Sequence, residues 1–159
     1  MTKEDSSSPT VATESVLLTS IVDADEKRDV AIVDIPNAFI QTRVENKKDR
    51  VIIRIRGVLS KWVTKTDPEV YSNYVTVDKK GDKLLLVECL NAIYGTMVAG
   101  LLYYRKFADS LDQKKFIKNP YDPCVWNKII DGKQCTICFH VDDCKISHVK
   151  SSVNDSIIA

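Results

Sequence analysis

Two short segments of the chain place aspartates where carboxylates could do chemistry. Residues 33–39 read VDIPNAF, so an apolar run ends on Asp34 and an aromatic residue follows five positions later. Residues 139–143 read FHVDD and set Asp142 and Asp143 side by side between two short apolar runs. Carboxylates on neighbouring strand ends can hold two Mg²⁺ ions about 3.5–4 Å apart, the arrangement used for phosphoryl transfer. Together the segments predict a two-metal site.

An adjacent pair of aspartates also has an ordinary structural explanation. Aspartate is common in turns because its side chain hydrogen-bonds to its own backbone. In the catalytic interpretation, Asp34 and Asp142 bridge both ions, whereas Asp143 points the other way along the pleat and is a secondary ligand. The aspartates alone leave both explanations open.

The elements that must position these residues follow from apolar periodicity. We expect a disordered tail over residues 1–7, a helix over residues 9–24, and a buried, central strand over residues 30–35 that ends before Pro36. Further strands are expected at residues 50–58, 75–77, 83–87, 121–130, 133–141 and 144–147, and helices at residues 59–74 and 92–114. This order indicates an α+β fold, with an antiparallel sheet and helices packed on one face.

Composition and charge are those of a globular domain. The chain has 159 residues, 44% hydrophobic and 28% charged, which is enough for one domain with a core and unlike a disordered segment. Its formal net charge of +1 is not the basic excess of a free-standing nucleic-acid-binding protein. Contacts to nucleic acid would need local patches, and the candidates are Lys47, Lys48, Arg50, Arg54 and Arg56, then Lys114, Lys115 and Lys118. The same side chains could equally form a solvated surface.

The sequence shows no apolar run long enough to span a membrane and no signal peptide, so we expect an intracellular protein with no membrane partner. Its five cysteines are expected to be reduced thiols. Cys135 and Cys138 have the spacing of a zinc-binding pair. However, residues three apart on a strand face opposite sides of a sheet, and no second pair follows, which argues against zinc.

Five segments resemble the reverse transcriptase of Ty1/copia-type retrotransposons, in the same order along the chain. Residues 139–143 resemble that family's Tyr-Val-Asp-Asp turn, with His140 in the place of tyrosine, and residues 33–39 resemble its first metal-binding motif. Residues 90–95 (LNAIYG) are similar to the family's Ser-Leu-Tyr-Gly segment, and residues 119–126 (NPYDPCVW) are similar to its Asp-Pro-Cys strand. Residues 8–11 (SPTV) are similar to the start of the helix that precedes its first metal-binding motif.

The resemblance implies a polymerase palm with partial fingers over residues 8–159, the fingers being an insertion at about residues 40–90. It implies RNA- and DNA-templated DNA synthesis, with a template-primer and deoxynucleoside triphosphates as partners. Two Mg²⁺ ions would be held by Asp34, Asp142 and Asp143. Such a protein would work in cytoplasmic particles and then in the nucleus.

The resemblance also implies nucleotide contacts. The backbone carbonyl of Ile35 would add a metal ligand, and Phe39 would be a steric gate that excludes a ribose 2′-hydroxyl. Tyr94 and Gly95 would flank the nucleotide pocket. Ordinary core packing is the alternative for Phe39, and a helix-entry turn that needs glycine is the alternative for Tyr94 and Gly95.

The chain departs from the family in ways that favour other interpretations. Residues 96–101 read TMVAGL where the family has Leu-Lys-Gln-Ala-Pro-Arg, so a lysine and an arginine near the substrate are absent. The family's basic fingers segment, thumb and RNase H are also missing, so we expect a truncated palm. The alternatives are a catalytically inactive relic or interaction domain that keeps the palm fold, and another palm-type enzyme such as a nucleotide cyclase.

Overall fold

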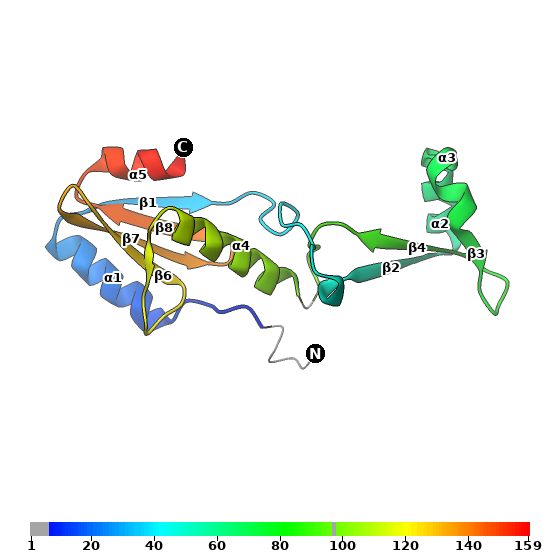
Figure 1. The fold of residues 1–159 in the computed structure, drawn as a ribbon, viewed down its shortest axis with the longest axis horizontal. Helices are drawn as coiled ribbons and strands as arrows, with labels where there is room; N and C mark the ends of the chain where they lie inside the picture. Colours follow the sequence, from blue (N-terminus) through cyan, green and yellow to red (C-terminus); the bar gives the residue numbers. More distant parts are fainter. Residues whose placement is uncertain (1–6, 97) are drawn as a thin grey trace.

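Two antiparallel sheets, each in its own lobe, organise the chain (Figure 1). The computed structural model describes residues 7–96 and 98–159, so nearly all of the predicted tail over residues 1–7 lies outside the described residues. The strands of the larger lobe are β1 (Asp29–Asp34), β5 (Ile117–Lys118), β6 (Val125–Ile130), β7 (Lys133–His140) and β8 (Asp143–His148). They pair in the order β1-β8-β7-β6-β5. The predicted α+β fold with an antiparallel sheet is confirmed.

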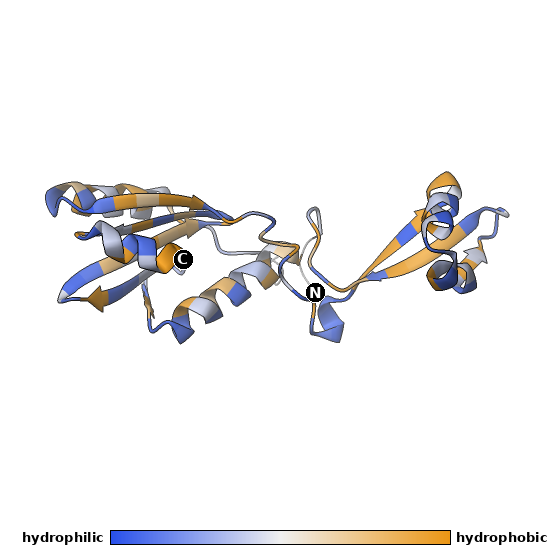
Figure 2. Ribbon diagram, turned by 90° about the horizontal axis from the view of Figure 1, so that it is seen from above, coloured by the Kyte–Doolittle hydropathy of each residue, from blue (hydrophilic) through white to orange (hydrophobic). Residues whose placement is uncertain are grey.

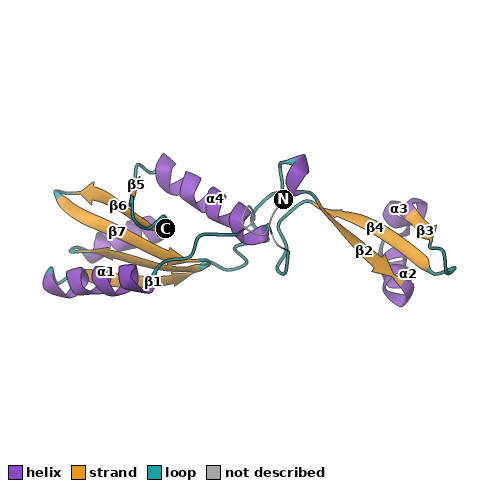
Figure 3. Ribbon diagram, turned by 90° about the horizontal axis from the view of Figure 1, so that it is seen from below, coloured by secondary structure: helices purple, strands orange, loops and turns teal. Residues whose placement is uncertain are grey.

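The smaller lobe is formed by the middle of the chain. Its elements are the 3₁₀ helix η2 (Lys47–Asp49), β2 (Val51–Arg56), α2 (Gly57–Thr66), α3 (Pro68–Tyr71), the 3₁₀ helix η3 (Ser72–Tyr74), β3 (Val75–Val77) and β4 (Lys83–Cys89). The strands pair in the order β2-β4-β3, and α2 packs on β2 and β4 (Figure 3). The predicted helix over residues 59–74 is broken at Asp67, whose carboxylate accepts a hydrogen bond from the Val70 amide at 3.2 Å and caps α3.

Helices cover both faces of the larger sheet, so the prediction that they pack on one face is wrong. These helices are α1 (Thr13–Asp25), α4 (Ala99–Gln113) and α5 (Ser151–Ile158). On one face, Lys145 of β8 reaches α1 and bonds to Thr19 and Asp23, each at 2.8 Å. On the other face, Ile137 packs in a buried cluster with Leu111 of α4 and Val153 of α5. The physical reason lies in β7, where residues 135–139 are all buried, because both of its faces are covered.

Strand β1 lies at an edge of the sheet, which corrects the prediction of a buried, central strand. Within the described residues it pairs only with β8. Its apolar residues alternate between a packed and an open side, and Ile32 keeps 78% of its surface exposed. An apolar run of this length cannot by itself distinguish an edge strand from a central one.

Both long helices begin later than the periodicity predicted. Helix α1 begins at Thr13 instead of residue 9, because the carboxylate of Asp122 holds the preceding backbone, accepting from the Ala12 amide at 2.9 Å. Helix α4 begins at Ala99 instead of residue 92, because a turn at Gly95, with φ +85°, comes first. That positive φ is the reason a glycine is needed there.

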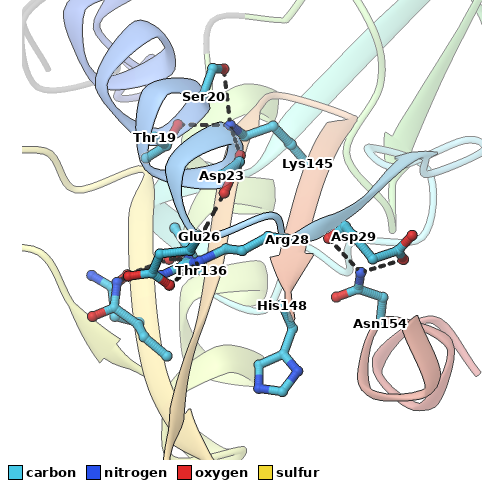
Figure 4. Close-up of polar contacts among 12 residues, drawn as sticks. Thr19, Ser20, Asp23, Glu26, Arg28, Asp29, Thr136, Lys145, His148 and Asn154 are labelled. Atoms are coloured by element: carbon cyan, nitrogen blue, oxygen red, sulfur yellow. Dashed lines mark hydrogen bonds and ion pairs between the residues drawn. The ribbon is translucent and has the colours of Figure 1, made fainter. Parts of the chain in front are cut away.

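Helix α1 is attached to the sheet by a buried cluster of charges instead of by its apolar residues (Figure 4). The Asp23 carboxylate lies 2.8 Å from the Lys145 ammonium and 3.9 Å from the Arg28 guanidinium. Arg28 also lies 2.9 Å from Glu26 and donates to Thr136 at 3.0 Å. The apolar residues of α1 are largely exposed, Leu17, Leu18 and Ile21 among them.

The five cysteines are free thiols and all are buried. Cys135 belongs to the cluster under α4, whereas Cys138 lies opposite Lys145 and so faces α1. The prediction that these two thiols face opposite sides of the sheet is therefore confirmed. No helix in the described part of the chain is long and apolar enough to cross a membrane.

We expect these thiols to resist labelling in the folded chain. Burial raises the pKa of Cys124 and of Cys144 to about 12, and that of Cys135 to about 11. Because the thiolate is the reactive form, raising the pH from 7 to 9 should leave all three nearly unreactive. Ellman's reagent should detect all five thiols only after the chain is unfolded in urea. Fast reaction of the native chain with several equivalents would contradict this packing.

Candidate metal and nucleotide site

Strand register brings the three predicted aspartates to one end of the larger sheet. Strand β1 runs antiparallel to β8, and Asp34, its last residue, is the direct partner of Asp143. Asp142 lies in the turn between β7 and β8, and its carbonyl accepts a hydrogen bond from the Ile35 amide at 3.0 Å. Segments more than a hundred residues apart in sequence therefore meet at this point.

The register makes Asp143, not Asp142, the direct cross-strand neighbour of Asp34. Directly opposed residues share one face of a sheet, so Asp34 and Asp143 extend from the same face. The sequence pattern predicted instead that Asp143 points away from Asp34 and Asp142 and is only a secondary metal ligand. Two like charges placed opposite each other destabilise a sheet unless something compensates them, and a cation would be such a compensation.

None of the three carboxylates forms a hydrogen bond or an ion pair with another of the described residues. Aspartates elsewhere in the chain have clear structural partners: Asp122 accepts from two backbone amides, and Asp131, in the turn between β6 and β7, pairs with Lys150 at 2.8 Å. Turn aspartates usually bond to their own backbone, but Asp142 and Asp143 do not. The ordinary structural explanation for the Asp-Asp pair thus has no contact to support it.

The donor chemistry at this end of the sheet suits Mg²⁺. Carboxylate oxygens and backbone carbonyls are hard ligands, and Mg²⁺ prefers them to nitrogen or sulfur. As the side chains are placed, however, no three Asp, Glu, His or Cys side chains among the described residues converge closely enough to hold an ion. The backbones of the three aspartates lie next to one another, but their side chains would have to rotate toward a common point to hold an ion.

Two of the residues predicted to contact the nucleotide, Phe39 and Tyr94, touch each other. Residues 36–41 form a turn soon after β1, with Asn37 at φ +55°. It carries Phe39 onto Tyr94, where the ring centroids are 4.5 Å apart, and toward Tyr103 of α4 at 5.9 Å. Phe39 is half-buried, which a side chain that simply packs in the core would also be. Gly95 has a positive φ, which a simple helix-entry turn that needs glycine would also require.

Sequence reasoning missed Tyr103, which is only 5% exposed. Its ring lies between Phe39 and Phe107, and its hydroxyl has no hydrogen-bond partner among the described residues. Burial raises the pKa of the Tyr103 phenol, and the nearby Cys144 and Asp142 raise it further. The spacing of four between Tyr103 and Phe107 was the available signal, because it places both rings on one side of α4.

The turn that carries the aspartate pair is strained. Val141, between His140 and Asp142, has φ +56°, a conformation that is an outlier for a β-branched residue. Such a conformation costs about 1–3 kcal/mol and persists only where the surrounding structure imposes it. Strained residues gather at functional sites, so this outlier adds to the reasons for regarding the turn as one.

At position 141 we expect glycine to give a more stable chain than alanine, although alanine is usually the more stabilising of the two. Val141→Gly should be more stable than Val141→Ala by about 1 kcal/mol, because only glycine adopts a positive φ without a steric cost. Comparing the two variants cancels the loss of the valine side chain. Urea denaturation of both chains measures the difference, and an alanine variant as stable as the glycine variant would show that the turn is unstrained.

Comparison with known proteins gives no relative of this chain. No family model, no curated protein and no solved structure matches it.

Proposed function

We propose that the chain is the palm of a copia-type reverse transcriptase, which transfers a nucleotide from a deoxynucleoside triphosphate to a primer 3′-hydroxyl. One observation carries the proposal. Strand register places Asp34 opposite Asp143 and beside the Asp142 turn, and none of the three carboxylates has a structural partner among the described residues.

In this proposal each residue of the site has a distinct task. Asp34, Asp142 and Asp143 would hold two Mg²⁺ ions, with the Ile35 carbonyl as a further ligand. When bound, the ions supply activation of the primer hydroxyl and neutralisation of the triphosphate charge. The contact between Phe39 and Tyr94 forms one wall of the nucleotide pocket, where the Phe39 ring would exclude a 2′-hydroxyl.

The template-primer would contact the smaller lobe, in the part of the fold proposed as partial fingers. Arg54 and Arg56 lie two residues apart on β2, so their side chains extend from the same face of the sheet. Together with Lys79 and Lys80 of the β3–β4 hairpin they line one groove, in which they outnumber its two carboxylates, Asp78 and Asp82. Lysine and arginine side chains on one surface supply the phosphate contacts that position a nucleic acid.

Primer extension on an RNA template, with Mg²⁺ and deoxynucleotides, tests the proposal. We expect incorporation by the chain that is lost in the Asp34→Asn and the Asp142→Asn variants. Full incorporation by either variant would contradict the assignment of the metal ligands.

A second candidate function is a non-catalytic interaction domain with the same fold. The observation in its favour is the apolar character of the smaller lobe, whose strands are largely hydrophobic (Figure 2) and where Trp62 of α2, Ile52 of β2 and Leu86 of β4 keep 62%, 53% and 50% of their surface exposed. Surfaces of this kind often bind another protein. Primer extension that is absent from the wild-type chain as well as from its aspartate variants would favour this candidate.

A further inference from the structure

Helix α1 of the larger lobe turns polar side chains toward its own sheet and apolar side chains outward. On the inner side, Thr19 and Asp23 each bond to the Lys145 ammonium of β8 at 2.8 Å. Three aliphatic residues elsewhere on the helix keep 60%, 63% and 65% of their surface exposed, and we call them the α1 stripe: Leu17, Leu18 and Ile21. A surface helix normally buries its apolar side, so this reversed arrangement leaves an apolar surface uncovered.

Helix α2 repeats the arrangement in the smaller lobe. Its Ser60 is 1% exposed, and the Ser60 hydroxyl lies 2.8 Å from the Gly57 carbonyl and 3.2 Å from the Lys83 carbonyl of β4. Three outward residues keep 58%, 59% and 62% of their surface exposed, and we call them the α2 stripe: Val58, Leu59 and Trp62. Both stripes have the spacing i, i+1, i+4, so each forms one compact patch on its helix.

The charges beside the two stripes are opposite in sign. Helix α1 carries the exposed acidic residues Glu14 and Asp25 and no basic residue. Helix α2 carries Lys61 and Lys65 and no acidic residue, and both lysines line one groove with Lys83, which no carboxylate borders. None of these five side chains forms an ion pair with a described residue. Each helix thus offers the charge that the other lacks.

The two lobes divide the charge of the chain in the same way. Residues 47–89 of the smaller lobe contain ten lysines and arginines and six aspartates and glutamates, a net charge of +4. Because the whole chain carries +1, the remaining residues carry −3. Helices α1 and α2 lie at opposite ends of the elongated molecule, so they do not meet within one copy (Figure 1). Complementary surfaces of this kind favour binding of a second copy, end to opposite end.

We propose that two copies of the chain form a reciprocal dimer, in which the α1 stripe of each copy packs on the α2 stripe of the other. Apolar side chains then cover apolar side chains, while Glu14 and Asp25 come close to Lys61 and Lys65 of the second copy. A two-fold axis makes this contact twice and covers both stripes of both copies, so the assembly closes as a dimer. The inference uses neither the metal site nor the nucleotide contacts, so it does not depend on the proposed function.

Sedimentation equilibrium of the full chain, from micromolar to millimolar concentration, tests the dimer by reversing its charges. One variant combines Glu14→Lys with Asp25→Lys, and the other combines Lys61→Glu with Lys65→Glu. Like charges then meet at both contacts, so we expect each variant alone to dimerise about 10- to 100-fold more weakly than the wild-type chain. An equimolar mixture of the two variants should recover the wild-type affinity, because each contact again joins unlike charges.

A substitution in the α2 stripe has a matched control in the same lobe. Trp62→Ala should weaken the dimer by about 30-fold, since buried tryptophans dominate the binding energy of many interfaces. Ile52 has a similar exposed fraction of 53%, but it lies opposite Glu88 on the face of the sheet that α2 does not cover. Ile52→Ala should therefore dimerise as the wild-type chain does. Circular dichroism should show all variants folded.

The outcomes decide between this dimer and other occupants of the stripes. Recovery of the dimer in the mixture of charge-reversed variants supports the inference, because only a contact between α1 and α2 explains it. A mixture that stays as weak as its components overturns the pairing of these two helices. A wild-type chain that remains monomeric at millimolar concentration overturns the dimer and leaves the stripes to a different protein.

Discussion

Asp34→Asn and Asp142→Asn will each lower the rate of primer extension by about a thousandfold. An amide keeps the size of the side chain but removes the charge that holds a cation. Stabilisation by a bound metal is worth several kcal/mol in the transition state, and each 1.36 kcal/mol is a factor of about ten in rate. Because neither carboxylate has a structural partner among the described residues, both variants should fold normally. Single-nucleotide incorporation over a range of Mg²⁺ concentrations measures the effect.

Asp131→Asn is the matched control for these variants. Asp131 also lies in a hairpin turn of the same sheet, but its carboxylate pairs with the Lys150 ammonium at 2.8 Å. We expect this variant to retain the wild-type rate. A loss in Asp131→Asn as large as in Asp142→Asn would point to a general effect of altering turns and would contradict a specific metal site.

The largest effect on stability is expected at the buried charge cluster beneath α1 (Figure 4). Asp23→Asn should lower the free energy of unfolding by about 3–5 kcal/mol, because breaking a buried ion pair leaves an uncompensated charge in the interior. Lys145 would lose its partner carboxylate at 2.8 Å and keep the Thr19 hydroxyl, and the Arg28 guanidinium, whose side chain is 2% exposed, would keep Glu26 and the Thr136 hydroxyl. Urea denaturation measures the change.

An exposed ion pair of the same lobe provides the comparison. The side chains of Lys150 and Asp131 are 55% and 57% exposed. Because solvent screens such a pair, Lys150→Ala should cost less than about 1 kcal/mol. If Asp23→Asn cost no more than Lys150→Ala, the cluster would not be what holds α1 on the sheet.

The features that the sequence predicted well depend on local patterns. The hairpin of β6 and β7 follows from an Asp-Gly turn between two apolar runs, and the end of β1 follows from Pro36. The placement of Asp34 beside the aspartate turn was expected from two motifs, and the strand register now shows how it arises.

The features that could not be predicted from the sequence depend on contacts between segments far apart in the chain. The late start of α1 requires the bond from Ala12 to Asp122, which spans 110 positions. The position of β1 at the sheet edge depends on strand pairing, and the position of Tyr103 between Phe39 and Phe107 depends on how α4 packs. Periodicity reports which residues are apolar but not which surface covers them.

The most direct test of the metal site is anomalous diffraction from crystals of the chain grown with Mn²⁺. We expect two anomalous peaks about 3.5–4 Å apart at the end of β1, in contact with Asp34 and Asp142. Crystals of the Asp142→Asn variant should lack both peaks. Mn²⁺ bound elsewhere in the wild-type chain, with none at this end of the sheet, would contradict a two-metal site.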